Sequence, residues 1–220
     1  MKMKYLLPIF ACLTLGNNAW ADETGGFDVG VKLSTLGAGV EVNYPINTSM
    51  TVAVGINKYS KSQTENIAGN DFDEDINLQT ISLLFNFHPF QGSFRITGGA
   101  MLNSNELKLS ADPNATYDIN GINYTSAEFG DLDATVDFQK IAPYVGVGFG
   151  HSARRGLGFT LDVGVLMQGE PNVDFNSTGG DLSNDPTFQA NLKQEEANAE
   201  DDIKGFTVYP VLALGVSYRF

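Results

Sequence analysis

The chain has 220 residues, of which 42% are hydrophobic, 11% aromatic and 18% charged, and its formal net charge is −13. The apolar content is too high for a disordered protein, and the negative charge opposes binding to nucleic-acid phosphates. After the first 21 residues no run of about 20 apolar residues remains, so the sequence also excludes a helical membrane protein.

The N-terminal segment has the pattern of an export signal. A basic start is followed by the apolar stretch Tyr5–Gly16, and Ala19-Trp20-Ala21 fits the small-x-small cleavage rule. We therefore predict a cleaved signal peptide at residues 1–21 and a single domain, an outer-membrane β-barrel as argued below, at residues 22–220.

The only cysteine, Cys12, lies inside that segment. A lipoprotein signal around it is the alternative, which is disfavoured because the bulky Phe10 stands where a small residue is expected. Cleavage after Ala21 would leave no cysteine for a disulfide or a thiolate site.

Most of the remaining chain consists of segments in which residues alternate with a period of two, which predicts β-strands. In the last segment Val208, Leu212 and Val216 share an apolar face, and the intervening residues are mostly small or polar. Seven earlier segments alternate in the same way. The predicted strands are Phe27–Thr35, Ala38–Tyr44, Thr51–Ser60, Ile76–His88, Phe94–Asn103, Phe138–His151, Leu157–Phe175 and Phe206–Phe220.

The composition of the two strand faces separates two folds that both alternate. A soluble sandwich has one apolar and one broadly polar face, whereas an outer-membrane barrel has an apolar outer face, a polar interior and aromatic ends. Here the second face mixes glycine with single charges such as Lys32 and Asp162. A sheet in lipid must also close, because its edges cannot be satisfied there. We therefore predict an all-β fold, an eight-stranded antiparallel transmembrane outer-membrane β-barrel, in preference to a soluble sandwich.

The lengths of the connections predict an orientation. The first outer connection, Ser34–Gly37, is very short, but short and long connections alternate after it. Bacterial barrels keep short turns periplasmic and long loops extracellular. We therefore expect the cell outer membrane of a Gram-negative bacterium, with both termini in the periplasm. The short connections are Pro45–Met50, Pro89–Ser93 and Ser152–Gly156, and the long ones are Lys61–Asp75, Ala111–Asp137 and Asn176–Gly205.

Two of the long connections carry signals of local structure. Tyr117–Tyr124 has an Asn-Gly pair at its centre, which predicts a tight hairpin. In the last connection Asp185 can cap a helix, Pro186 suits its first turn and Gly205 can end it. The residues that would share one face of this helix are Phe188, Leu192 and Ala199.

The acidic charge is concentrated in the long connections. They hold eighteen acids and three bases, whereas the acids and bases of the remaining predicted mature chain balance. One interpretation is a set of solvated loops. The other is a field that concentrates cations at the barrel mouth, either basic solutes or the divalent ions that bridge lipopolysaccharide.

The predicted lumen face carries charges of both signs, which cannot all stay hydrated in a narrow barrel and should pair. Two interpretations remain open, a structural salt-bridge plug and a polar conduit or gate. The predicted lumen-lining charged residues are Lys32, Glu41, Arg95, Lys140, Asp162 and Arg219, with Asp28 as a further acid.

Other motifs give weaker signals. Gly146, Gly148 and Gly150 alternate on a strand that precedes no helix, so we expect them to make room for large inward side chains. The histidines, His88 and His151, fall near predicted periplasmic turns. Asp71, Asp73 and Asp75 lack the glycine and closing glutamate of an EF-hand loop. We expect no catalytic residues, no metal site and no cofactor.

The C-terminus resembles the targeting strand that the bacterial barrel assembly machinery recognises. Recognition by strand addition would use outward side chains in register. The predicted assembly signal consists of Leu212, Leu214, Val216, Tyr218 and Phe220.

The sequence also resembles the ornithine-uptake, carbapenem-associated outer-membrane proteins (the CarO type) and related small proteobacterial barrels. The resemblance runs in order through the mature chain at low identity. It implies an eight-stranded barrel with slow passage of small basic amino acids. The matching stretches are Tyr117–Tyr124, Ile141–Gly148, Gly169–Val173, the Glu/Asn-rich last connection and Tyr209–Val211.

Three functions follow as hypotheses. We expect a small channel or porin for uptake of small cationic solutes, such as ornithine-like basic amino acids. The alternative is a plugged structural or interaction barrel that acts through its acidic extracellular loops on lipopolysaccharide, divalent ions or host surfaces. A lipid A-modifying enzyme is less favoured. The expected partners are outer-membrane lipid and lipopolysaccharide, the assembly machinery and small cationic solutes.

Overall fold

The computed structural model describes residues 26–67, 70–112, 115–150 and 156–220, without the side chains of residues 65–67, 70 and 71. The predicted signal peptide, Cys12, His151 and most of the turn Ser152–Gly156 lie outside the described residues. The strands are β1 (Asp28–Ser34), β2 (Gly37–Asn47), β3 (Met50–Ile67), β4 (Asn70–Phe87), β5 (Phe94–Asn103), β6 (Glu106–Ala111), β7 (Thr116–Ile119), β8 (Ile122–Thr125), β9 (Gly130–Asp137), β10 (Ile141–Phe149), β11 (Gly156–Met167), β12 (Asn172–Gly179) and β13 (Val208–Arg219). The helices are α1 (Ser126–Phe129) and α2 (Pro186–Ile203).

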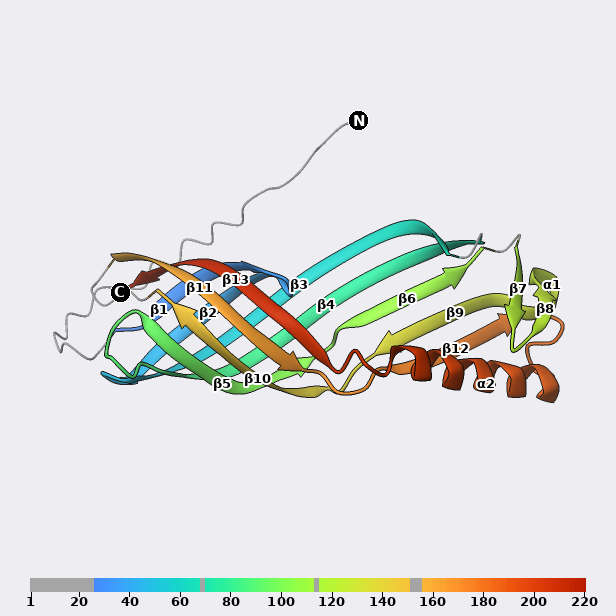
Figure 1. The fold of residues 1–220 in the computed structure, drawn as a ribbon. Coiled ribbons are helices and arrows are strands. Elements are labelled where there is room, and N and C mark those ends of the chain that lie inside the picture. Colours follow the sequence, from blue (N-terminus) through green and yellow to red (C-terminus); the bar gives the residue numbers. More distant parts are fainter. Residues whose placement is uncertain (1–25, 68–69, 113–114, 151–155) are drawn as a thin grey trace, which may run out of the picture.

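Eight of the described strands close into an antiparallel ring, in the order β1-β2-β3-β4-β5-β10-β11-β13 and back to β1 (Figure 1). The first and last strands close it, with Val31 opposite Val216. The prediction of an eight-stranded antiparallel barrel is therefore confirmed. Within the described chain, no helix combines the length and apolar character needed to cross a membrane.

The outer wall of the ring is apolar, as the alternation predicted. Leu33 and Phe159 are 72% and 73% exposed, although side chains of this size and polarity are usually buried in water-soluble proteins. Val208, Leu212 and Val216 also point outward. Aromatic rings gather at the end that carries the chain termini, where Phe27 stacks on Phe220 with centroids 5.1 Å apart.

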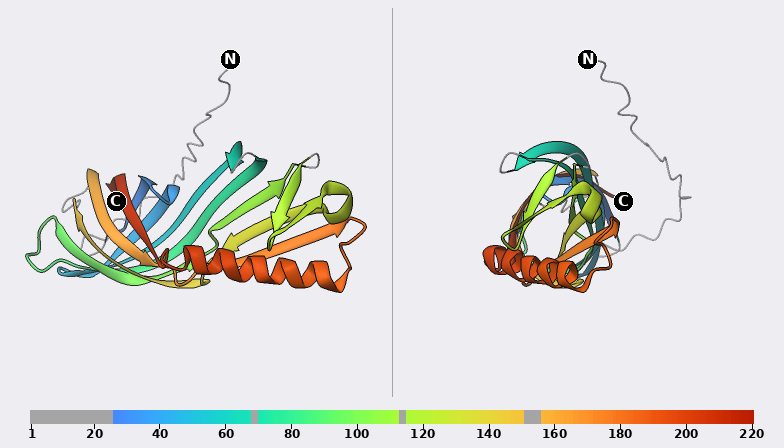
Figure 2. Two further views of the ribbon diagram at one scale, coloured as in Figure 1. Left: turned by 45° about the vertical axis from the view of Figure 1, so that its right-hand side comes forward. Right: turned by 90° about the vertical axis from the view of Figure 1, so that its right-hand side faces the viewer.

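The long connections are not irregular loops but continue the sheet beyond the barrel. We use the term extension for the described chain within residues 61–78, 104–140 and 168–207. There β3 and β4 pair along their full length, and β6, β9 and β12 add to β4 in that order. Figure 2 shows this curved sheet continuing beyond the end of the barrel opposite the C-terminus, with α2 beside it.

Polar side chains explain why the alternation did not reveal the outer part of β3 and β4. Residues 61–66 and 70–75 contain one apolar side chain, Phe72, so period two leaves almost no apolar trace there. Cross-strand hydrogen bonds hold the pair instead. Gln63 Nε2 donates to Glu74 Oε2 at 2.6 Å, and Thr64 Oγ1 donates to Asp73 Oδ1 at 2.9 Å.

The hairpin and the helix predicted in the long connections are both confirmed. Asn120 and Gly121 have φ of 53° and 78° between β7 and β8, as a tight primed turn requires. Asp185 accepts hydrogen bonds from the backbone N–H of Thr187 and of Phe188 and so caps α2. The hairpin, α1, β9 and α2 share an apolar core of Tyr117, Ile119, Tyr124, Phe129, Leu132, Phe188 and Leu192.

Candidate functional site: the barrel interior

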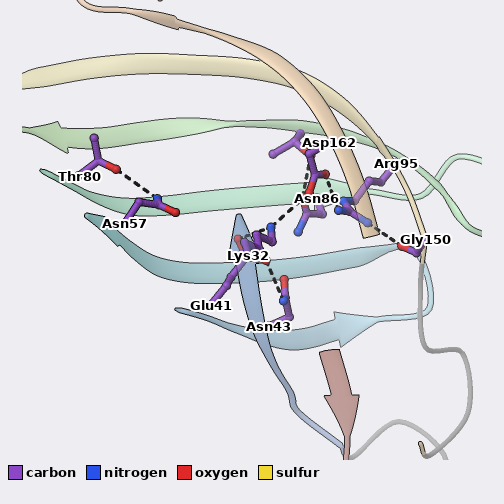
Figure 3. A network of polar contacts seen from close by, with 10 residues as sticks. Lys32, Glu41, Asn43, Asn57, Thr80, Asn86, Arg95, Gly150 and Asp162 are labelled. Carbon is purple, nitrogen blue, oxygen red and sulfur yellow. Dashed lines mark hydrogen bonds and ion pairs between the residues drawn. The ribbon is translucent and has the colours of Figure 1, made fainter. Parts of the chain in front are cut away.

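Four charged side chains meet in the barrel interior, each from a different strand (Figure 3). Lys32 of β1 donates to Glu41 Oε2 of β2 at 2.7 Å and to Asp162 Oδ2 of β11 at 3.3 Å. Asp162 also accepts from the guanidinium of Arg95 on β5. We call this chain of alternating charge, Glu41–Lys32–Asp162–Arg95, the ionic network.

Strand register explains how Arg95 reaches Asp162. Gly148 of β10 lies directly opposite Arg95 on one side and Asp162 on the other. A Cβ at this glycine would lie 2.7 Å from Arg95 Nε, too close for a real contact. The glycine therefore lets two side chains from non-adjacent strands meet across β10, which confirms the expected role for Gly148. At Gly150 a Cβ would meet the backbone of Phe159 rather than an inward side chain.

The network satisfies its own charges. The four side chains are only 8–16% exposed, and their formal charges cancel. Further hydrogen bonds come from Asn43 Nδ2 to Glu41 Oε1 at 2.9 Å and from Arg95 Nη1 to the carbonyl of Gly150 at 2.6 Å. Buried charges persist only when they are paired and hydrogen-bonded in this way. The network therefore fills this level of the lumen with paired, hydrogen-bonded side chains.

An apolar layer lies between the ionic network and the extension. Inward-facing residues form this layer, so the prediction of a polar interior is wrong at this level of the barrel. Their even or odd position in each strand could have revealed them, since Leu84, Met101 and Leu166 fall on the inward face. The layer consists of Leu36, Ala53, Leu84, Met101, Ala142, Tyr144, Leu166 and Val211, with Tyr209 packed against it.

Two small cavities flank the ionic network. The one toward the apolar layer has a volume of about 40 Å³ and is lined by Lys32, Leu36 and Tyr144 among others. The one toward the chain termini has a volume of about 30 Å³ and includes Asp28 and His88 in its wall. Each cavity has room for a few water molecules. Both are therefore too small to hold an amino acid.

The remaining predicted lumen charges lie away from the network. Arg219 lies near the chain termini, with its Nε 3.8 Å from Asp28 Oδ1. Lys140 precedes β10, has an exposed side chain and lines neither cavity. Strand alternation suggested an inward Lys140, but the regular strand begins only at Ile141.

The other singled-out residues form no common site in the described structure. His88 Nδ1 lies 3.1 Å from the carbonyl oxygen of Gly92, at the short-turn end of β4. Asp73 and Asp75 accept hydrogen bonds from Thr64 and Ser62 of β3. The side chain of Asp71 lies outside the described set.

Comparison with solved structures identifies the fold. A crystal structure of Acinetobacter baumannii CarO aligns with 91% of this chain and 100% of its own at 20% identity, with a TM-score of 0.57. A. baumannii CarO2 aligns over 89% and 98% at the same identity and TM-score. A major outer membrane protein from Thermus thermophilus aligns over 89% and 99% at 15% identity, with a TM-score of 0.46. The predicted resemblance to CarO-type proteins is thus confirmed in fold.

No protein-family model matches the sequence, and no curated protein matches it.

Proposed function

We propose that this chain is an outer-membrane protein of a Gram-negative bacterium, with its termini in the periplasm and the extension outside the cell. The apolar outer wall supports this, because a soluble monomer rarely exposes so large a continuous apolar surface. The aromatic residues around the termini suit a membrane interface. The outward Leu212, Leu214, Val216, Tyr218 and Phe220 fit recognition by the assembly machinery.

Within that setting, the barrel passes small cationic solutes slowly through a lumen that is closed at rest. The ionic network carries this proposal. Lys32 Nζ occupies a position between two carboxylates, Glu41 and Asp162, which an incoming ammonium group could take in its place. An anion has no equivalent partner, because the guanidinium of Arg95 is already held by Asp162 and the carbonyl of Gly150.

Flux into liposomes tests the proposal. Purified protein reconstituted in liposomes should admit ornithine or arginine faster than empty vesicles do, and glutamate no faster. The double variant Leu36→Ala/Met101→Ala thins the apolar layer and should raise cation flux severalfold. The matched control, Leu33→Ala/Leu102→Ala, shortens large apolar side chains of the outer wall instead and should leave flux unchanged.

Absence of flux above empty vesicles in both the wild type and the thinned variant would exclude a channel. It would favour a closed barrel that acts through the extension, which the small size of the two cavities already supports as the second candidate. That candidate predicts binding to lipopolysaccharide or divalent ions through the exposed acidic face of the extension. Replacement of Asp73 and Asp137, both exposed, by Asn should then weaken binding while flux stays nil.

We propose no enzymatic activity. A lipid A-modifying site needs a catalytic histidine near the outer leaflet, but His88 lies at the end of β4 that carries the short turns and the chain termini. Lipid A mass spectra should therefore be the same with and without the protein.

A further inference from the structure

The sheet of the extension has an open edge at β3. This strand pairs with β4 along its full length but with β2 only as far as Lys58 (Figure 1). Gln79, opposite Lys58, turns its carbonyl away from β3, toward the N–H of Ser104. Since this direction alternates along antiparallel strands, the N–H groups of Ser60 and Ser62 point to the open edge. No strand of the described chain pairs with β3 there.

The opposite edge of the same sheet shows which partner such groups take. On β12 the N–H groups of Phe175 and Val173 donate to two carboxylates of α2, at 3.0 and 3.1 Å. These carboxylates belong to Glu196 and Glu200. Hydrogen bonds to an ionised acceptor are stronger than those between neutral groups. The chain therefore supplies anions to one edge of the sheet, and an anion at the β3 edge has to come from outside the chain.

Two lysines flank the first open N–H of this edge. Lys58 and Lys61 are exposed and form no ion pair within the described part of the chain. They lie on opposite faces of β3, on either side of Ser60, because successive side chains of a strand alternate. Their long, flexible side chains can therefore reach an anion beside the Ser60 N–H from both faces of the sheet.

The charges on β4 confine an anion to the base of this edge. Opposite Ser62 lies Asp75, and further out come Glu74 and Asp73, which would repel an anion. Opposite residues 58–61, by contrast, β4 carries no charge. The β4 residues there are Gln79, Leu78, Asn77 and Ile76. The favourable place is therefore next to the barrel rim, between Lys58 and Lys61.

An apolar groove in the outer wall of the barrel begins at the same place. It has a volume of about 1170 Å³ and is lined mostly by outward residues of β1, β2, β3, β11 and β13. Lys58 belongs to this lining, together with Leu33, Ile56 and Leu214. One continuous surface thus offers an apolar wall to alkyl chains and, directly beyond it, two ammonium groups and a backbone N–H to an anion.

The geometry points to a binding site for one molecule of a phosphorylated, acylated sugar lipid, the chemistry of lipid A. Its phosphate lies beside the Ser60 N–H, between Lys58 and Lys61, and its acyl chains lie in the groove. The inference rests on the proposed outer-membrane location, which puts the leaflet that holds lipopolysaccharide next to this rim, but not on passage of solutes through the lumen. The accessibility of introduced cysteines on intact cells tests that location separately.

Native mass spectrometry of the full-length barrel tests the site. Barrel released from detergent micelles with rising amounts of diphosphoryl lipid A should show one saturable lipid adduct. The double variant Lys58→Gln/Lys61→Gln should bind lipid A about tenfold more weakly or worse, since it loses both charged donors. The matched control Lys193→Gln/Lys204→Gln removes the same charge from exposed lysines of α2 and its end, and should bind as the wild type does.

A second pair of variants tests the groove. Ala38→Phe places a bulky side chain in the groove beside Lys58 and should weaken binding. Ala100→Phe adds the same side chain to the outward face of β5, away from the groove, and should not.

Four results would each overturn the inference. The first is no saturable adduct, and the second is unchanged affinity in the Lys58→Gln/Lys61→Gln variant with an intact barrel by circular dichroism. The third is equal binding of lipid A with and without its phosphates, which would mean simple apolar partition. The fourth is displacement of lipid A by inorganic phosphate at equal concentration, which would mean a site for free anions.

Discussion

At the scale of single residues, the arrangement of side chains in the barrel interior depends on small residues beside large ones as much as on charge. The ionic network exists because Gly148 lies between Arg95 and Asp162, and the hydroxyl of Tyr144 lies over another glycine, Gly164 of the adjacent strand. The sequence predicted that charges of opposite sign would pair, but not which ones. Partner choice depends on the register between strands far apart in the chain, which period-two alternation does not encode.

Gly148→Ala should disturb the network without changing any charge. The added Cβ meets Arg95 and Asp162, so one of them must move, at a cost of about 1–3 kcal/mol. Gly98→Ala is the control, because a Cβ at Gly98 meets no atom within 4 Å, and its effect should stay below about 0.5 kcal/mol. Urea unfolding of both variants in lipid vesicles checks the difference, and equal midpoints would contradict it.

At the scale of elements, α2 protects the free edge of the extension sheet. Glu196 and Glu200 accept hydrogen bonds from the backbone N–H of Phe175 and Val173 on β12, at 3.0 and 3.1 Å. An open edge strand would otherwise invite pairing with other chains. These two acids were counted in the sequence only as part of the acidic charge. Their role depends on where the helix packs, which its own pattern does not show.

The cap of α2 gives a prediction for this element. Asp185→Ala should destabilise the extension by about 1 kcal/mol, because the N–H groups of Thr187 and Phe188 lose their acceptor. Asp181→Ala removes the same charge from an exposed residue nearby and should have little effect. Limited proteolysis within α2 reads out the difference, and equal cleavage rates for the two variants would count against the capping role.

A pH dependence follows from Asp133 on β9. Partial burial acts to raise the pKa of this carboxyl, but the Ser110 hydroxyl and the Lys108 ammonium, 3.0 Å away, together hold its pKa below the ordinary 3.8. Because the folded value is the lower one, the stabilisation is complete well above pH 3.8 and is lost as the pH falls through the folded pKa.

The wild type should therefore have a higher free energy of unfolding than the Asp133→Asn variant at about pH 6, and this difference should shrink as the pH falls to about 3. The gap is small throughout, because the pair is partly exposed and surface pairs contribute at most about 1 kcal/mol. Asp131→Asn, on the same strand and exposed, serves as the charge-matched control. Urea midpoints across this range measure the effect, and a gap that widens toward low pH would contradict it.

At the scale of the whole molecule, the sequence predicted the eight-stranded ring because apolar alternation persists wherever a strand separates the apolar outer wall from the barrel interior. It did not predict that the long connections continue the sheet, since residues 61–66 and 70–75 of β3 and β4 contain a single apolar side chain, Phe72. It also missed the apolar layer, because Leu84, Met101 and Leu166 interrupt an otherwise polar inward pattern. The inward or outward position of a residue is therefore readable in the sequence, whereas its partner on another strand is not.

The proposed orientation predicts which cysteines a bulky maleimide can reach on intact cells. A cysteine at Asn198, exposed on α2, should react, and one at Thr48, exposed in the turn after β2, should react only after the outer membrane is opened. Permeabilised cells give the control in which both sites react. Reaction at Thr48→Cys alone on intact cells would reverse the proposed orientation.

The strands of the barrel end at different levels on the side of the extension. The hairpin between β1 and β2 ends at Ser34–Gly37, whereas β3 runs on from Lys58, opposite Ala38, to Ile67. At about 3.3 Å per residue, that difference amounts to roughly 30 Å along the strand. In the proposed orientation, the low rim at Ser34–Gly37 would lie close to the lipid surface. A solute that entered over this rim would then pass the polar head groups of the surrounding leaflet first, rather than come straight down from the medium.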